Sequence, residues 1–290
     1  MSRSGPPGRS ESERVGFIGL GDMGGRIALR IAAAGLRVTV YDPRSEAVGR
    51  LVAAGAHSGR SSAAVVADST ISAVCVVDDR QLRQVIDEVA PNLDPGKILV
   101  VHSSVAPSTM RELEAVVRKT GAALVDAPVS GSRPAADLGE LTVLLGGEDR
   151  DIDQIEYLLA TYAKRAVRVG AVGAAQAMKI TNNVMLHMNH LIALEALRFA
   201  RSQGLTEEAV IEAVNVSSGR SWVTETWGLI DDMLRDHPQA GSAGLVGMMS
   251  KEMWQAVSAA RQDLTAMPLT ALGTQVSRQH FEERMRDLEL

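Results

Sequence analysis

The sequence predicts an α/β fold in which a doubly wound, mostly parallel sheet is followed by an all-helical C-terminal domain. Short apolar strands alternate with helical patterns as far as about residue 170, which is typical of a parallel sheet covered by helices. Beyond that point the pattern is helical and no second strand-rich block follows. The chain has 290 residues, 46% of them hydrophobic, which is enough to fill two ordinary cores.

The strands of the first domain are expected where short apolar runs are bounded by polar or turn-forming residues. These runs are residues 15–18, 38–41, 71–77, 98–101, 122–126, 141–145 and 166–169. Residues 128–139 contain Gly, Ser and Pro where a crossover helix should be, so we expect a loop there.

A long inter-domain helix is expected next, because residues 174–201 contain neither Pro nor Gly. At 1.5 Å per residue it would be roughly 40 Å long, so it must leave the first domain. Its apolar residues occupy more than one face, which favours a second subunit packing against it in a homodimer or homotetramer. Thr206 should cap the following helix, and the remaining helices are expected over residues 207–214, 223–234, 245–261 and 269–286.

The expected domain limits follow from these elements. Residues 1–13, rich in Ser, Gly, Pro and Arg, are expected to form a disordered tail without the apolar stretch of a secretory signal. Residues 14–172 would form the sheet domain, and residues 173–290 the helical domain that binds substrate and mediates oligomerisation.

A glycine motif joins the first strand to the first helix. It consists of Gly19, Leu20, Gly21, Asp22, Met23 and Gly24, in the pattern Gly-x-Gly-x-x-Gly. Gly19 would permit a tight turn, Gly21 a close approach of backbone to a pyrophosphate, and Gly24 close packing of helix on strand. A purely structural turn is the alternative, since the chain has 26 Gly. The preceding strand, the following helix and the acidic Asp42 at the end of the second strand favour a Rossmann-type domain that binds a dinucleotide.

The choice between NAD and NADP depends on two residues. A carboxylate at Asp42 would pair with the ribose hydroxyls of NAD and repel a 2′-phosphate. Arg44 would instead neutralise that phosphate, or it is simply a solvated side chain in the first turn of a helix. Of the two cofactors, the sequence favours NAD.

Composition excludes other classes of partner. The formal net charge is -5 and no basic block is present, which argues against nucleic acid. No apolar run reaches the roughly 20 residues that span a bilayer, so no membrane partner is expected. Cys75 is the one cysteine, so no disulfide can form within the chain. A buried cysteine of this kind fits a reducing compartment, and we expect a cytoplasmic protein.

Two further segments follow the sheet edge at which substrate and cofactor should meet. Lys179 and Asn183 are four residues apart, so they share one face of the long helix. Burial among apolar neighbours would lower the pKa of Lys179 toward a range useful for acid-base chemistry, whereas a lysine that extends to water would have no such role. Ser130 and Gly131 offer a hydroxyl and backbone N–H groups to a carboxylate, or form a plain turn.

Together these segments resemble the β-hydroxyacid dehydrogenase family, which contains 3-hydroxyisobutyrate dehydrogenase and tartronate semialdehyde reductase. The resemblance covers nearly the whole chain. It depends on the glycine motif, Ser103-Ser104-Val105-Ala106-Pro107, Asp126-Ala127-Pro128-Val129-Ser130-Gly131, Gly146-Gly147, Lys179 with Asn182-Asn183, and Lys251-Glu252.

The resemblance implies a role for several residues. Lys179 would be the general acid-base group, and Asn183, with Asn182 beside it, would hydrogen-bond the substrate. Ser130 and Gly131 would hold the substrate carboxylate. The remaining implied site residues are Val77 and Ser104 near the nicotinamide, Ser132 in the substrate loop, and Lys251, which would close over substrate and cofactor.

Three departures from the family pattern are visible. Ser132 stands where a second glycine is usual, which would reshape the substrate cradle. Glu252 replaces the usual aspartate, and a frequent proline is missing beside Val77. None of these changes removes Lys179 or Asn183.

The implied reaction is reversible hydride transfer between a nicotinamide cofactor and a small β-hydroxy acid, without a metal. His187 and His190 are three residues apart on the long helix, but no third ligand completes a recognisable metal site. An imine reductase and a non-catalytic dinucleotide-binding scaffold are the alternatives. Lys179 argues against both, because those relatives generally carry another residue at that position.

Overall fold

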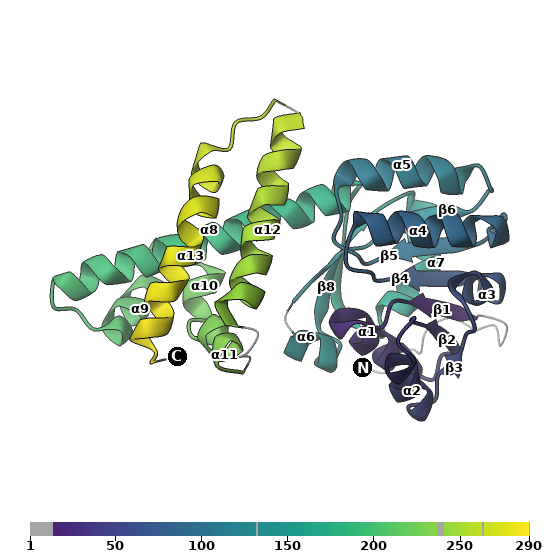
Figure 1. Cartoon of the computed structure of the whole chain (residues 1–290), viewed down its shortest axis with the longest axis horizontal. Helices are drawn as coiled ribbons and strands as arrows, with labels where there is room; N and C mark the ends of the chain where they lie inside the picture. Colours follow the sequence, from purple (N-terminus) through teal and green to yellow (C-terminus); the bar gives the residue numbers. More distant parts are fainter. Residues whose placement is uncertain (1–13, 132, 237–240, 263, 290) are drawn as a thin grey trace, which may run out of the picture. The chain divides into compact units, whose positions relative to one another are not determined.

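The computed structural model describes residues 14–131, 133–236, 241–262 and 264–289, and the expected tail over residues 1–13 lies outside them. The chain divides into two compact units, Met1–Lys179 and Ile180–Leu290 (Figure 1). Of the helices in the described ranges, none combines the length and apolar character needed to cross a membrane.

The first unit contains the sheet. Its strands are β1 (Val15–Ile18), β2 (Val38–Tyr41), β3 (His57–Ser58), β4 (Ile71–Val74), β5 (Ile98–Val101), β6 (Ala123–Asp126), β7 (Val129–Ser130), β8 (Leu141–Gly146) and β9 (Ala163–Gly170). Its helices are α1 (Asp22–Ala33), α2 (Ser45–Ala53), α3 (Ser62–Ala67), α4 (Asp79–Val89), α5 (Pro107–Arg118), α6 (Arg133–Leu138) and α7 (Asp149–Leu159), with a 3-10 turn η1 (Ala90–Asn92).

The sheet has the strand order β3-β2-β1-β4-β5-β6-β8-β7, and β9 pairs with β8. The strands from β3 to β6 are parallel, whereas β8 is antiparallel to both β6 and β7. This topology confirms the predicted doubly wound, mostly parallel sheet. The chain passes from β1 outward to β2 and β3, and from β4 outward in the opposite direction to β5 and β6. The carboxyl ends of the neighbouring strands β1 and β4 are therefore the point where the strand order reverses, which is where such folds bind ligands.

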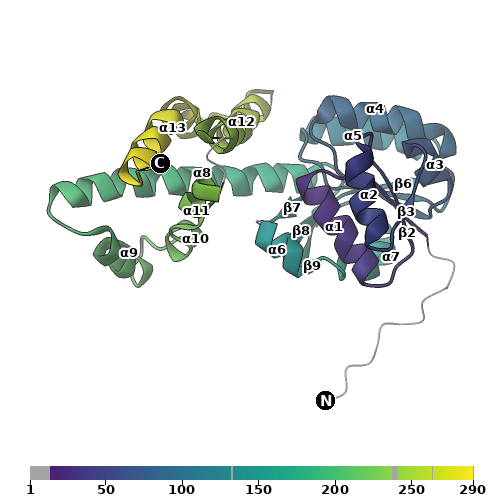
Figure 2. The same cartoon turned by 60° about the horizontal axis from the view of Figure 1, so that its bottom comes forward.

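Helices cover both faces of the sheet, and each face has its own core (Figure 2). Phe17 and Val100 point into one core, which α1, α2 and α7 complete. Ile18 and Leu99 point into the other, which α3, α4 and α5 complete. Neighbouring residues of one strand thus enter opposite cores, as the period of two in a strand requires, and both faces of the strand are apolar.

Two segments of this unit differ from the sequence-based expectation. The predicted strand over residues 71–77 ends at Val74, because the backbone N–H of Val76 donates to the Ser103 hydroxyl and Val77 is 70% exposed. The predicted loop over residues 128–139 contains β7 and α6. Helix α6 forms because Ala136 is fully buried and packs in the core that also holds α1.

The second unit is helical apart from its connections. It contains most of α8 (Ala174–Ser202), then α9 (Glu207–Asn215), α10 (Trp222–Glu225), α11 (Leu229–Asp236), α12 (Gly241–Gln262) and α13 (Pro268–Asp287). Thr206 caps α9 by accepting a hydrogen bond from the Ala209 N–H, as expected. The single helix expected over residues 223–234 is instead two helices, because Gly228 lies between them with a φ of +94°.

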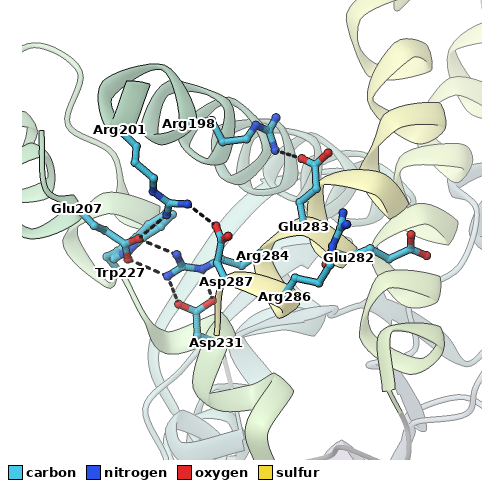
Figure 3. A network of polar contacts seen from close by, with 10 residues as sticks. All are labelled: Arg198, Arg201, Glu207, Trp227, Asp231, Glu282, Glu283, Arg284, Arg286 and Asp287. Atoms are coloured by element: carbon cyan, nitrogen blue, oxygen red, sulfur yellow. Dashed lines mark hydrogen bonds and ion pairs between the residues drawn. The ribbon is translucent and has the colours of Figure 1, made fainter. Parts of the chain in front are cut away.

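A buried ionic cluster ties three helices of this unit together (Figure 3). Arg284 of α13 is 6% exposed and donates to Glu207 of α9 and Asp231 of α11. Its guanidinium also lies 5.3 Å from the Trp227 ring, whose Nε1 donates to Glu207. The apolar core beside this cluster is formed by Leu191, Leu234, Val246, Met249, Met253 and Phe281.

Candidate active site

The glycine motif makes the turn between β1 and α1. Gly19 has a φ of +89°, and a Cβ on it would lie 2.3 Å from the Cys75 carbonyl oxygen. A Cβ on Gly24 would lie 2.1 Å from the Gly19 carbonyl oxygen, so neither position admits a side chain. A Cβ on Gly21 would meet no protein atom within 4 Å. The protein itself therefore does not require glycine at Gly21, and a phosphate group lying against the backbone would account for it.

The start of α1 also fits an anion. Gly21 is its N-cap and provides no side-chain cap for the first N–H groups of the helix. Unpaired N–H groups at a helix N-terminus favour a phosphate. The motif as a whole thus fits the pyrophosphate of a dinucleotide, with Gly19 shaping the turn and Gly21 leaving space beside it.

Asp42 follows β2 directly and its carboxylate supports the glycine turn. Oδ2 accepts a hydrogen bond from the Leu20 N–H at 2.7 Å and another from Arg44 Nη2 at 2.9 Å. Oδ1 accepts from the Arg44 N–H at 2.9 Å and from Arg44 Nε at 2.8 Å. Burial alone would raise the pKa of Asp42, but the hydrogen bonds from Arg44 and Leu20 outweigh it and lower the pKa to about 2.

The carboxyl ends of the central strands are linked by a buried hydrogen-bond network. Gln176, 1% exposed in the first turn of α8, donates to the Ser103 carbonyl oxygen and to Asp126, and it accepts from the Val105 N–H. Asp126, fully buried at the end of β6, also accepts from the backbone N–H groups of Gly173 and Gln176. The start of the long helix is therefore fastened to the ends of β5 and β6.

Burial dominates the electrostatics of this network. It raises the pKa of Asp126 to about 6 although the hydrogen bonds from Gln176 act in the opposite direction. His102, at the end of β5, is also buried, and this burial lowers its pKa to about 4. Its Nδ1 lies 2.7 Å from the Ala127 carbonyl oxygen and its Nε2 lies 3.2 Å from the Tyr162 hydroxyl. His102 is thus a neutral packing residue.

The expected nicotinamide residues lie at the same strand ends. Val77 follows β4 and is 70% exposed, and Ser104 follows β5 and is also exposed. Both side chains are therefore accessible at the carboxyl edge of the sheet, where Ser103 connects the two loops through its hydrogen bond to Val76.

The expected substrate loop follows β7. Ser130 is half-buried at the end of the strand, and Gly131 is exposed with a φ of +139° that favours glycine. Ser132 lies outside the described residues. The next residue, Arg133, donates from Nε to Asp22 Oδ2 at 2.6 Å, so the substrate loop is tied to the glycine motif across 111 positions of sequence.

Lys179 and Asn183 lie one turn apart on α8. Lys179 is half-buried, and Asn183 is 5% exposed. Asn182 donates from Nδ2 to Asn183 Oδ1 at 3.4 Å, a long and therefore weak contact. Asp126 holds the same helix at its first turn, so it sets the position from which Lys179 extends.

Lys251 lies in the second unit and is exposed on α12. Its neighbour Glu252 faces α8 and accepts a hydrogen bond from His187 Nε2 at 2.6 Å. His190 stacks between the Trp227 and Phe281 rings, and burial lowers its pKa to about 4. Within the described ranges, no group of three or more His, Cys, Asp or Glu residues is arranged to hold a metal ion.

Sequence reasoning missed Gln176 and Arg133 as contributors to the site. Gln176 is a polar residue in an otherwise Ala-rich first helical turn, which is a weak signal for a structural contact. Arg133 gives no comparable signal, because its partner Asp22 lies far away in the sequence.

Comparison with known proteins identifies the family. Residues 14–173 match the model described as the NAD binding domain of 6-phosphogluconate dehydrogenase. Residues 173–289 match the model described as NAD-binding of NADP-dependent 3-hydroxyisobutyrate dehydrogenase. The chain is 30% identical over 269 residues to 2-(hydroxymethyl)glutarate dehydrogenase of Eubacterium barkeri, an alignment that covers 92% of this chain and 88% of the relative.

Solved structures agree with this assignment at the level of fold. The Mycobacterium tuberculosis 3-hydroxyisobutyrate dehydrogenase, solved with L-serine, matches with a TM-score of 0.82 and 23% identity, over 92% of this chain and 93% of that one. A Streptomyces aurantiacus imine reductase matches with a TM-score of 0.65 and 20% identity, over 92% and 94%. The chain belongs to the β-hydroxyacid dehydrogenase family and is an NAD(P)-dependent oxidoreductase.

Proposed function

We propose that the protein interconverts a small β-hydroxy acid and the matching semialdehyde or keto acid, with Lys179 as the general acid-base group. The observation that carries this proposal is the attachment of α8. Asp126 and Gln176 fasten its first turn to the ends of β5 and β6, at the carboxyl edge of the sheet that also carries the glycine motif, and Lys179 follows within the next turn. Orientation of this kind contributes a large part of the barrier lowering in many enzymes.

The proposed chemistry divides between cofactor and protein. The nicotinamide ring supplies the hydride acceptor or donor when it is bound. In the oxidation direction Lys179, as the neutral amine, takes the hydroxyl proton, and in reduction its ammonium group returns a proton to the same oxygen. Asn183 orients that oxygen, and Ser130 with the Gly131 backbone binds the carboxylate. Acid-base assistance of this kind is worth about 10²- to 10⁴-fold in rate.

A Lys179→Ala variant tests this role. We expect kcat for a panel of small hydroxy acids to fall by about 10²- to 10⁴-fold, while dinucleotide affinity, measured by fluorescence titration, stays within a factor of two or so. Lys119→Ala, which removes an exposed lysine just after α5, is the matched control and should be fully active. Activity of Lys179→Ala close to that of the control would refute the proposed role.

We further propose that Arg44 lets the protein accept NADP as well as NAD. A carboxylate has about four acceptor positions, and the four hydrogen bonds from Leu20 and Arg44 occupy those of Asp42. The ribose hydroxyls of NAD would have to displace Arg44 to reach this carboxylate. A 2′-phosphate would instead meet a guanidinium whose side chain is 62% exposed and which already offsets the charge of Asp42. This arrangement weakens the sequence-based preference for NAD.

An Arg44→Ala variant tests the cofactor proposal. One charge-assisted hydrogen bond to phosphate is worth about 1.5–3 kcal/mol, which corresponds to a shift of roughly 10- to 100-fold in the ratio of kcat/KM for NADP to that for NAD. Arg50→Ala, exposed on α2, is the control. A ratio that is unchanged in Arg44→Ala, or that moves toward NADP, would contradict the proposal.

We propose a homo-oligomer in which α8 packs against another copy of the chain. Four of its large apolar side chains are 41–69% exposed and recur every seven residues, at Met178, Met185, Ile192 and Phe199. A seven-residue repeat places them along one helix face, which is typical of a helix-packing seam. Ile192→Glu with Phe199→Glu should reduce the molar mass measured by light scattering to that of the monomer, 30.8 kDa. An unchanged mass would exclude this face.

A further inference from the structure

A buried histidine and a half-buried glutamate of the second unit join α8 to α12, and no step of the proposed reaction uses them. His187 is 3% exposed, and its Nε2 lies 2.6 Å from Glu252 Oε2. The Glu252 side chain is 22% exposed, so the contact is largely shielded from water. Because the acceptor is a carboxylate oxygen, the Nε2–H of His187 is the donor.

The hydrogen bond to Glu252 is the polar contact that orients the His187 ring. Its other ring nitrogen, Nδ1, is buried and has no hydrogen-bond partner among the described residues. Packing limits the rotation of the His187 ring. The hydrogen bond to Glu252 adds a directional contact between this ring and one turn of α12. A hydrogen bond weakens steeply when its length or angle changes, and this one is largely shielded from water, so it favours one placement of the Glu252 turn against His187.

The positions of these residues connect them to the proposed site. His187 lies four residues after Asn183, so the two share a face of α8 one turn apart. Glu252 directly follows Lys251 on α12. The hydrogen bond therefore joins the α12 turn that carries Lys251 to the α8 turn that follows Asn183, and both turns belong to the same compact unit.

We propose that His187 and Glu252 are positioning residues, which hold Lys251 at the correct separation from Asn183 for a carboxylate substrate. This inference depends on the proposed function, in which Asn183 orients the substrate, and on the role in closing over substrate that the family resemblance implies for Lys251. Since Lys251 would act by attracting the substrate's charge, displacing it should weaken substrate binding more than it slows proton transfer at Lys179. The length of Glu252 matters here, because aspartate at this position would be one methylene shorter.

Two substitutions of His187 separate the hydrogen bond from packing. The amide nitrogen of Gln can occupy the place of His Nε2, whereas that of Asn occupies the place of Nδ1 and does not reach Glu252. His187→Gln should therefore preserve the contact and His187→Asn should break it, although both remain polar and smaller than the imidazole. Glu252→Asp should resemble His187→Asn. Glu195→Gln, on an exposed position of α8, is the control.

Steady-state kinetics provide the first readout. We expect His187→Asn and Glu252→Asp to raise KM for the hydroxy acid roughly tenfold, the effect of one lost hydrogen bond of ordinary strength. Their kcat and dinucleotide affinity should stay within about a factor of two or three. His187→Gln and Glu195→Gln should match the parent protein. Equal KM values for the Asn and Gln variants of His187, or a joint loss of kcat and dinucleotide binding, would overturn the proposal.

Hydrogen exchange provides a readout that does not depend on turnover. His187→Asn should speed amide exchange in the α12 turn around Lys251 relative to His187→Gln, because that turn loses its anchor. If the parent protein oxidises no hydroxy acid, the proposed function fails, while the exchange experiment still tests the contact. If turnover is normal but exchange is identical in the two variants, the positioning role fails and the proposed function stands.

Discussion

Replacing Arg284 with Met should destabilise the second unit more than any exposed charge substitution. Arg284 is 6% exposed and reaches two carboxylates, those of Glu207 and Asp231 (Figure 3). Methionine retains much of the side-chain volume but no charge. The substitution leaves Asp231, itself 4% exposed, buried without the cation that compensates it.

The magnitude follows from the burial of each partner. Breaking a buried pair by removing one member costs about 3–5 kcal/mol, because the other charge stays in a medium of low polarity. Glu207 adds little, since its side chain is 32% exposed and can be solvated. The contact of Arg284 with the Trp227 ring adds about 0.5–1 kcal/mol. We therefore expect a loss of about 3–5 kcal/mol in the free energy of unfolding.

Urea unfolding followed by tryptophan fluorescence measures this loss selectively. All three tryptophans, Trp222, Trp227 and Trp254, belong to the second unit, so the signal reports that unit. The double variant Arg284→Met with Asp231→Leu should recover about 1–3 kcal/mol of the loss, because no charge is left buried. A loss below about 1 kcal/mol in the single variant, within the range of surface pairs, would refute the reasoning. So would a double variant no more stable than the single one.

Two further predictions concern the first unit. Gly21→Ala should fold like the parent but bind dinucleotide about tenfold more weakly, because its methyl group would occupy the space left for a phosphate. Gly24→Ala should instead unfold at a lower temperature, because its Cβ would meet the Gly19 carbonyl oxygen. Equal melting temperatures, with equal dinucleotide affinities, would contradict this. The raised pKa of Asp126 makes stability fall as pH rises from about 4 to 6, and the lowered pKa of His102 makes it fall as pH drops from about 6.5 to 4. Asp126→Asn removes the contribution of Asp126, which in the parent protein opposes the loss caused by His102 as pH drops. The free energy of unfolding of this variant, measured by urea unfolding with circular dichroism, should therefore fall between pH 7 and pH 4 by about 2–3 kcal/mol more than that of the parent. An equal or smaller fall would contradict the raised pKa of Asp126.

Features encoded by neighbouring residues were predictable from the sequence. The glycine turn, the cap of α9 by Thr206 and the length of α8 each depend on a few residues within one or two turns of chain. The reversed direction of β8 was not predictable, because an apolar run has the same pattern in either orientation. Helix α6 was missed for a related reason. It has only six residues, among Gly, Ser and Pro that predict a loop, and it is stabilised by contacts with α1, which lies over a hundred residues away in the sequence.

The role of Lys179 shows where sequence periodicity reaches its limit. Helical spacing places Lys179 beside Asn183, but it cannot show whether that face of the helix meets a cofactor or water. What ties α8 to the sheet is a carboxylate, Asp126, located 50 residues before its partner Gln176. A buried carboxylate is costly unless several donors satisfy it, and here two backbone N–H groups and one amide do so. Those donors exist only at the correctly placed start of α8, so the cost of burying Asp126 penalises any other docking of the helix. The position of the proposed catalytic lysine is therefore set by a long-range polar contact, and no local pattern around Lys179 could have revealed it.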